Sequence, residues 1–178
     1  MRRYIGSTIK SKETHKELKA HAVPEVVKAA VKAEETVLYF AYGSNMWLAQ
    51  MQTRCPGSVK LGRAILSKYK WIINARGYAN VVKAKKHAVE GVLYSITKTN
   101  EKTLDVFEGV AQGCYSKVML PVEYNGSVHQ ALVYIDPIVI EGLPKVAYVK
   151  RINAGLKDAK LSKKYVNFIR RSVPAVVK

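Results

Sequence analysis

Two features of the sequence could do chemistry together: a glycine turn that follows an apolar strand, and a glutamate on the apolar side of a short helix. The segment Tyr39–Asn45 leads from a strand predicted over 37–42 into a helix predicted over 46–51. Gly43 has no Cβ, so a ligand can approach the backbone there. Free N–H groups at such a turn can bind a carboxylate or phosphate, although an ordinary capped strand-to-helix connection is the alternative.

The glutamate is Glu108, at the end of a helix predicted over 101–108. Leu104 and Phe107 share one face of this helix, and Glu108 follows Leu104 by four residues, so it should point to the same apolar side. Burial raises the pKa of a carboxyl group towards the range in which it can accept and then donate a proton. Two alternatives stay open: fraying of the helix end into solvent, and a buried hydrogen bond to the backbone or a tyrosine.

Length and composition indicate an ordinary globular protein. The chain has 178 residues, of which 48% are hydrophobic, enough for one sizeable core and not typical of a disordered protein. No apolar stretch approaches the roughly 20 residues that span a bilayer, and the first residues lack the apolar run of a secretory signal. The two cysteines, Cys55 and Cys114, exclude a disulfide framework, and the four histidines have no metal-ligand spacing. We therefore expect a cytoplasmic protein without a metal site or a membrane span.

The formal net charge of +17 is unevenly distributed along the chain. Residues 145–178 carry ten Lys or Arg and one acid, in a segment with helical patterning. Such a surface can attract nucleic acid or an anionic membrane, or can be a solvated face. No zinc finger, aromatic RNP pattern or KH-type loop accompanies the charge, so we do not expect an obligatory nucleic-acid partner.

The chain divides into a mixed-charge extension over residues 1–36 and a domain over residues 37–178. Pro24 should separate two short helices in the extension. The domain begins with β-type patterning, and Asn125-Gly126 predicts a tight hairpin turn. Beyond 37–42, strands are predicted over 59–74, 79–84, 88–96, 115–123 and 128–135.

Helices interrupt and follow these strands. The helix over 101–108 should be capped by Thr99 or Asn100 and should end before Gly109. Two further helices are predicted over 145–156 and 162–172. Strands in a run, without regular βαβ alternation, indicate an α+β fold: a small mixed, mostly antiparallel β-barrel or strongly curved sheet with flanking helices.

The chain from about residue 37 to residue 174 resembles the γ-glutamylcyclotransferases. The order and spacing of four segments fit that family along nearly the whole core. With Asn45 after the Gly-Ser pair, the chain is similar to the branch that acts on γ-glutamyl amino acids. The segments that carry the resemblance are Leu38–Met46, Glu90–Tyr94, Leu104–Val110 followed by Tyr115, and Tyr148–Gly155.

The resemblance implies an activity and a role for each matched residue. The implied reaction cyclises a γ-glutamyl group to 5-oxoproline and releases an amino acid or amine, without a cofactor. Glu108 matches the acid/base glutamate, Tyr148 a tyrosine that hydrogen-bonds the substrate, and Tyr115 a further pocket tyrosine. The residues that match the loop holding the γ-glutamyl group are Tyr39, Phe40, Ala41, Tyr42, Gly43, Ser44 and Asn45.

Residues 74–82 depart from the Gly-rich turn expected in relatives, and we expect Tyr78 and Asn80 to reshape the acceptor side of the pocket. The acceptor group, and a biosynthetic or detoxifying role, therefore stay open. A non-catalytic small-ligand-binding protein and a basic protein that binds nucleic acid or an anionic surface are the alternative functions. The expected partner is a small γ-glutamyl substrate, with a homodimer as one option for the assembly.

Overall fold

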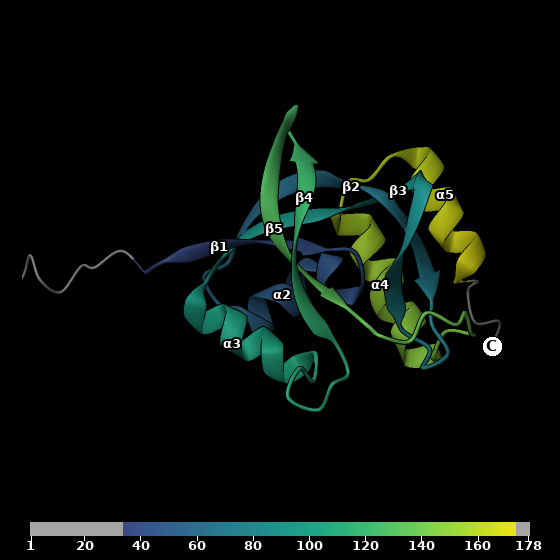
Figure 1. Cartoon of the computed structure of the whole chain (residues 1–178), viewed down its shortest axis with the longest axis horizontal. Coiled ribbons are helices and arrows are strands. Elements are labelled where there is room, and N and C mark those ends of the chain that lie inside the picture. Colours follow the sequence, from purple (N-terminus) through teal and green to yellow (C-terminus); the bar gives the residue numbers. More distant parts are fainter. Residues whose placement is uncertain (1–33, 174–178) are drawn as a thin grey trace, which may run out of the picture. The chain divides into compact units, whose positions relative to one another are not determined.

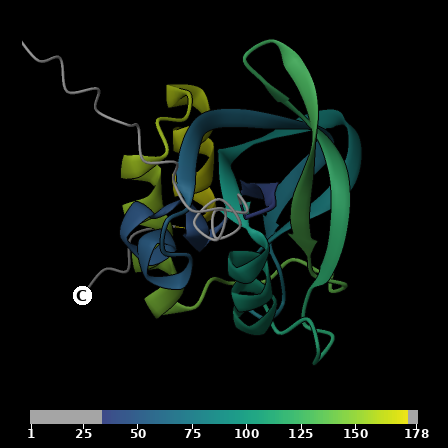
Figure 2. The same cartoon turned by 90° about the vertical axis from the view of Figure 1, so that its left-hand side faces the viewer.

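A closed five-stranded barrel forms the centre of the structure, a computed structural model that describes residues 34–173 (Figure 1 and Figure 2). The strands follow one another around it in the order β1-β3-β2-β4-β5. All neighbouring pairs are antiparallel except β1 and β5, which run parallel. The prediction of a small, mostly antiparallel barrel in an α+β fold is confirmed. The strands are β1 (Thr36–Ala41), β2 (Val59–Ile73), β3 (Ala79–Thr97), β4 (Ser116–Tyr124) and β5 (Ser127–Ile135).

The long strand β3 differs from the sequence prediction, which divided it into two strands over 79–84 and 88–96. The division followed from the basic stretch 83–87, which has few apolar residues. In the structure the pairing with β2 passes from Ser67–Ala88 directly to Tyr69–Lys83, with Lys68 between them at φ 67°. The extended backbone therefore continues through a bulge, and its basic side chains project into solvent instead of ending the strand.

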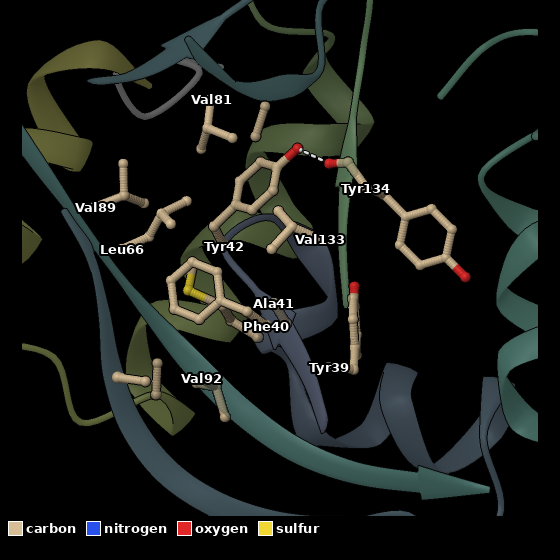
Figure 3. Close-up of a cluster of buried hydrophobic side chains, with 14 of the residues drawn as sticks. Tyr39, Phe40, Ala41, Tyr42, Leu66, Val81, Val89, Val92, Val133 and Tyr134 are labelled. Carbon is tan, nitrogen blue, oxygen red and sulfur yellow. Dashed lines mark hydrogen bonds between the residues drawn. The ribbon is translucent and has the colours of Figure 1, made fainter. Parts of the chain in front are cut away.

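Strand β1 lies between β3 and β5. Its successive side chains point to opposite faces, and the two faces have different neighbours. Tyr39 pairs with Tyr94 of β3 and with Leu132 of β5. Figure 3 shows Phe40 on the side of Leu66, whereas Tyr39 faces Tyr134. Successive side chains of a strand point to opposite faces, so one strand can contribute to the core and to a second, polar region.

The hairpin of β4 and β5 closes through the predicted Asn125-Gly126 turn. Tyr124 and Ser127 pair on either side of it, and both turn residues have positive φ, 49° and 77°. A two-residue turn of this type matches the twist of antiparallel strands, and Asn-Gly is the sequence that adopts it most readily. This prediction is confirmed.

Helices pack on the barrel and connect its strands. Figure 2 shows α4 (Val146–Asp158) and α5 (Lys163–Ser172) on one side of the barrel and the β4–β5 hairpin on the other. Both helices agree closely with their predictions. Helix α3 (Lys98–Phe107) begins three residues earlier than predicted. Its cap is Thr97, whose hydroxyl accepts from the Asn100 amide at 3.1 Å while the Asn100 side chain accepts from the Thr97 amide at 3.3 Å.

The first 33 residues and the last five lie outside the described part of the chain, and the predicted extension with its two helices falls almost wholly there. From residue 34 to residue 173, no helix is long and apolar enough to cross a membrane.

Gly91 of β3 allows β1 to approach closely just before the glycine turn. A Cβ at this position would lie 2.5 Å from the Ala41 carbonyl oxygen and 2.6 Å from the Phe40 ring. We predict that Gly91→Ala lowers the free energy of unfolding by about 1–3 kcal/mol, because the fully buried Phe40 has no space to move. Chemical denaturation of the purified variants measures this change.

Ala88→Ser on the same strand is the matched control, because Ala88 is exposed and the added oxygen meets solvent. Its free energy of unfolding should stay within about 0.5 kcal/mol of the starting protein. Equal stability of the two variants would contradict the close approach described for Gly91.

Candidate active site

A cavity of about 380 Å³ lies where the turn after β1 meets the end of α3 and the start of α4. We call it the Glu108 pocket. Residues from five separate segments of the chain meet in its wall, so no single sequence motif forms it. Eight of the ten predicted site residues line it: Tyr39, Tyr42, Gly43, Ser44, Asn45, Glu108, Tyr115 and Tyr148.

The other two predicted site residues, Phe40 and Ala41, lie in the core and not in the pocket wall. Phe40 is fully buried and Ala41 is 1% exposed. Figure 3 shows Phe40 among the apolar side chains of β2 and β3. The strand period of two accounts for Phe40, since Tyr39 and Phe40 cannot face the same side of β1.

The turn after β1 has a shape that the sequence did not predict. Instead of one helix over 46–51, a single 3-10 turn (η1, Ser44–Met46) is followed by the extended residue Trp47 and then by α2 (Leu48–Arg54). Neither helix start has a side-chain cap, so the alternative of an ordinary capped strand-to-helix connection is wrong. The side chains of Ser44 and Asn45 instead bond to Gln50 of α2.

Gly43 and Tyr148 form one wall of the pocket. A Cβ on Gly43 would lie 2.7 Å from the Tyr148 hydroxyl oxygen, so only glycine allows this approach. That oxygen accepts a hydrogen bond from the Ala79 amide at 3.2 Å, and the Ser44 amide also points towards it. Burial raises the pKa of Tyr148 to about 12, so its O–H stays protonated and is free to donate into the pocket.

Asn45 is 4% exposed and uses both ends of its side-chain amide. Its Nδ2 donates to the Tyr39 hydroxyl at 2.8 Å and to Glu108 Oε1 at 3.1 Å. Its Oδ1 accepts from Gln50 Nε2 at 2.7 Å and from an Arg54 guanidinium nitrogen at 2.9 Å. Two donors at Oδ1 fix the orientation of the amide, so the Nδ2 group must face the glutamate.

Gln50 and Arg54 are functional residues that the sequence analysis missed. They are four apart on α2 and therefore share one face, which was the available signal. Arg54 also lies 3.6 Å from Glu108 Oε1, and its guanidinium is 4.5 Å from the centre of the Phe107 ring. The helix thus supplies a positive charge beside the pocket carboxyl.

Glu108 follows the last residue of α3 as its C-terminal cap, and its side chain is only 17% exposed. The expected inward orientation is confirmed, because Glu108 lines the pocket together with the turn and Tyr148. Phe107 was expected on the buried face, but it is 54% exposed and packs against Arg54 outside the core. The helix ends at Phe107. Beyond it, the Glu108 side chain points into the pocket, whereas the Phe107 side chain does not lie on the buried face with Leu104.

Burial raises the pKa of the Glu108 carboxyl above its usual range. The positive charge of Arg54 and the hydrogen bond from Asn45 oppose this shift, with smaller opposing effects from Arg151 and Arg76. Desolvation and nearby charges act in opposite directions on a buried acid, and desolvation is the larger effect here. A carboxyl with a raised pKa is suited to accept a proton and return it near neutral pH.

Two further arginines line the pocket and were not expected. Arg76 donates from Nε to the buried Asp136 at 2.9 Å and from its terminal nitrogen to the Cys114 carbonyl at 2.9 Å. The Arg151 guanidinium lies 5.3 Å from the centre of the Tyr148 ring, and its Nε makes no hydrogen bond to any described residue. Arg76 is thus held by the protein, while the Arg151 guanidinium lines the pocket beside the Tyr148 ring.

Tyr78 and Asn80 were both expected to shape the pocket, but only Tyr78 lies in its wall. Tyr78 lines the pocket and packs edge-to-face on Tyr148 at 5.1 Å between ring centres. Asn80 does not, because it is fully buried and its amide donates to the carbonyls of Asp136 and Ile138 at 2.9 and 3.0 Å. It holds the segment after β5.

Comparison with known proteins agrees with this geometry. The sequence pattern of the family described as "Gamma-glutamyl cyclotransferase, AIG2-like" matches residues 39–152, which include every predicted site residue. The chain belongs to this family. Its members thus share with this chain the segment that runs from the glycine turn through Glu108 to Tyr148.

Individual relatives are similar over most of the chain. The gamma-glutamylcyclotransferase of Mus musculus is 29% identical over 142 residues, which are 74% of this chain and 76% of the mouse protein. That of Homo sapiens is 29% identical over 143 residues, with the same coverage. A solved structure titled "Gamma-glutamyl cyclotransferase" superposes with a TM-score of 0.73 at 25% identity, covering 81% of this chain and 91% of that one. The barrel is therefore a gamma-glutamyl cyclotransferase fold.

We predict that Arg54→Gln raises the pKa of Glu108, because it removes the largest effect that lowers it. Titration of the Glu108 carboxyl carbon by NMR measures the change without depending on any activity. Arg63→Gln is the control, since Arg63 pairs with Glu90 at 3.5 Å and does not line the pocket. An unchanged or lowered pKa in the Arg54 variant would contradict this account of the pocket charges.

The raised pKa of Glu108 also makes stability depend on pH. A carboxyl whose pKa is higher in the folded than in the unfolded chain favours folding when protonated, so its contribution is lost as pH rises through the folded value. Glu108→Gln carries no charge, so it should be more stable than the starting protein at neutral pH. This difference should shrink as pH falls towards the ordinary glutamate value of 4.5. Urea denaturation of both proteins across that range measures it; a constant difference would refute the prediction.

Proposed function

We propose that the protein is a γ-glutamylcyclotransferase that converts a γ-glutamyl group into 5-oxoproline and releases the attached amino acid or amine. The observation that carries the proposal is the buried Glu108 carboxyl, hydrogen-bonded to Asn45 of the glycine turn at 3.1 Å in a pocket of about 380 Å³. Membership of the gamma-glutamyl cyclotransferase family supports a cyclotransferase enzyme, and the relatives in mouse and human carry that name.

In the proposed reaction the substrate's own α-amine attacks its γ-carbonyl carbon. A carbon–nitrogen bond forms and closes a five-membered ring, while the Glu108 carboxylate accepts the proton that the amine loses. The amide bond to the leaving group then breaks, and its nitrogen takes that proton from Glu108. The carboxylate is restored, so one group serves as base and then as acid. Such proton transfers typically contribute ~10²–10⁴-fold to the rate.

The pocket's task is then mainly to hold the γ-glutamyl chain folded, because attacking and attacked atoms belong to the same molecule. The Tyr148 hydroxyl oxygen accepts hydrogen bonds from two backbone amides. Its own proton is therefore available for donation to the substrate. Within residues 34–173, the amides of Gly43 and Asn45 donate to no protein acceptor. We assign these donors to the substrate carboxylate or to the oxygen that becomes negative during attack.

The charge of the pocket fits an anionic substrate. Arg54, Arg76 and Arg151 all line it, against the single carboxyl of Glu108. We assign Arg151 to a substrate carboxylate, because it lines the pocket and its guanidinium lies beside the Tyr148 ring. Tyr78 and the exposed Phe107 at the pocket wall are assigned to the acceptor side, where they would contact the leaving amino acid or amine.

The test is release of 5-oxoproline, measured by mass spectrometry, from a panel of γ-glutamyl amino acids, γ-glutamylamines and glutathione. We predict turnover of at least one compound and a loss of at least about 10²-fold in Glu108→Gln, because the amide can neither accept nor return the proton. Glu123→Gln, at an exposed position on β4, is the matched control and should keep full activity.

Full 5-oxoproline release by Glu108→Gln would overturn the assignment of the acid/base. Tight binding of a γ-glutamyl compound by the starting protein, with no turnover across the panel, would instead favour the non-catalytic ligand-binding alternative.

A further inference from the structure

A second, basic groove lies between the β2–β3 hairpin and helix α5. It has a volume of about 410 Å³ and shares no lining residue with the Glu108 pocket. Four of its lining residues are cationic: Lys70, Lys86, Lys164 and Arg171. We call it the basic groove. Helix α5 lies beyond residues 39–152, the range that matches the family, so one side of this groove falls outside the matched range.

The charge of the groove comes from two stretches far apart in the sequence. Residues 68–88 contain six Lys or Arg and residues 162–173 contain four, and neither stretch contains Asp or Glu. The sequence analysis placed most of the excess charge in the C-terminal segment 145–178. The fold sets the β2–β3 hairpin beside α5 (Figure 1), so Lys70 and Lys86 line the same groove as Lys164 and Arg171.

Most of the groove's cations are free of protein partners. Among the residues that the structure describes, the only acid in the groove wall is Glu90, which accepts from the Ser162 amide at 2.8 Å and from its hydroxyl at 2.6 Å. Lys70 pairs with Glu141 at 2.6 Å. Over residues 34–173, no acidic group lies within salt-bridge distance of Lys86, Lys164 or Arg171. These three cations are available to an anionic ligand.

Aromatic rings accompany the cations. Phe168 and Tyr165 line the groove, with 5.7 Å between their ring centres, and both are half-buried. Phe168 also packs edge-to-face on the buried Trp71 at 6.4 Å. This contact fixes its ring in place. A fixed, partly exposed ring among cations is the combination on which single-stranded nucleic acids stack their bases while their phosphates meet Lys and Arg.

A membrane surface fits the groove less well. Surface binding of this kind uses exposed apolar side chains that enter the lipid next to the basic ones. Within 68–88 and 162–173, no large apolar residue is exposed. The apolar face of α5 packs on the protein, with Ile169 fully buried.

We propose that the basic groove binds single-stranded nucleic acid, with phosphates on Lys86, Lys164 and Arg171 and a base on Phe168. Each phosphate contact to a single strand contributes about −0.7 to the slope of log affinity against log salt concentration. Three contacts give a slope of about −2. Binding should thus weaken steeply with salt, and a duplex of the same length should bind less well because its bases are not available for stacking.

The experiment is fluorescence anisotropy of the full chain with a labelled oligo-dT strand of about 12 nucleotides, from about 50 to about 200 mM salt. The triple variant Lys86→Gln, Lys164→Gln, Arg171→Gln should lose at least about tenfold in affinity and flatten the salt slope. The control triple Lys102→Gln, Lys150→Gln, Lys157→Gln removes the same charge at exposed positions outside the groove and should bind nearly as the starting protein does.

Phe168→Leu tests the stacking contact: it should weaken binding at least about fivefold and leave the salt slope unchanged. Thermal melts confirm that each variant is folded. Equal losses in the two triple variants would overturn the proposal, because net charge and not the groove would then explain binding. No binding of the strand near 50 mM salt would overturn it too, and vesicles of anionic lipid bound in its place would identify a membrane surface as the partner.

Discussion

The hydrogen bond from Asn45 Nδ2 to Glu108 Oε1 is the interaction on which the arrangement of the pocket depends. It joins the turn after β1 to the end of α3, two segments that are 63 residues apart in the sequence. Gln50 and Arg54 of α2 hold the other end of the same amide, so three elements meet at one side chain. A buried carboxyl is costly unless donors satisfy it, and this amide supplies a donor without supplying a compensating charge. The carboxyl is therefore held in place while its pKa stays raised.

The barrel holds β1, the strand that leads to Asn45, in a fixed position. β1 is paired on both sides, to β3 and to β5, so the strand that delivers Tyr39 to the pocket cannot shift without breaking two sets of hydrogen bonds. Two tyrosines continue this rigidity into the pocket wall: the buried Tyr42 donates to the Tyr134 carbonyl, as Figure 3 shows, and the partly buried Tyr115 donates to the Ala79 carbonyl at 3.1 Å. Catalytic geometry built on paired strands is held more closely than geometry built on loops, which suits a reaction whose main requirement is a folded substrate.

The molecule separates two kinds of positive charge. The arginines of the Glu108 pocket lie close to a buried acid and are partly held by it or by Asp136. The cations of the basic groove line a different surface and have few acidic neighbours. The first group modulates the pKa of the buried Glu108 carboxyl, and the second produces a field that reaches into solvent. The net charge of +17 thus includes cations in two different environments. The effect of each cation depends on where the fold places it.

The sequence alone determined the fold class, the Asn125-Gly126 hairpin, both C-terminal helices and the glutamate that lies in the pocket. These follow from local rules: strand and helix periodicity, turn chemistry, and a four-residue spacing from Leu104 to Glu108. The resemblance to a known family added the expected roles.

Only the tertiary structure decided that Phe40 and Ala41 lie in the core, that Phe107 packs on Arg54 outside it, and that Gln50, Arg54 and Arg151 line or brace the pocket. It also decided that residues 68–88 lie beside α5 to form one basic groove. Local patterns indicate which face of an element is apolar, whereas the neighbours of a polar side chain depend on which distant segments the barrel brings together.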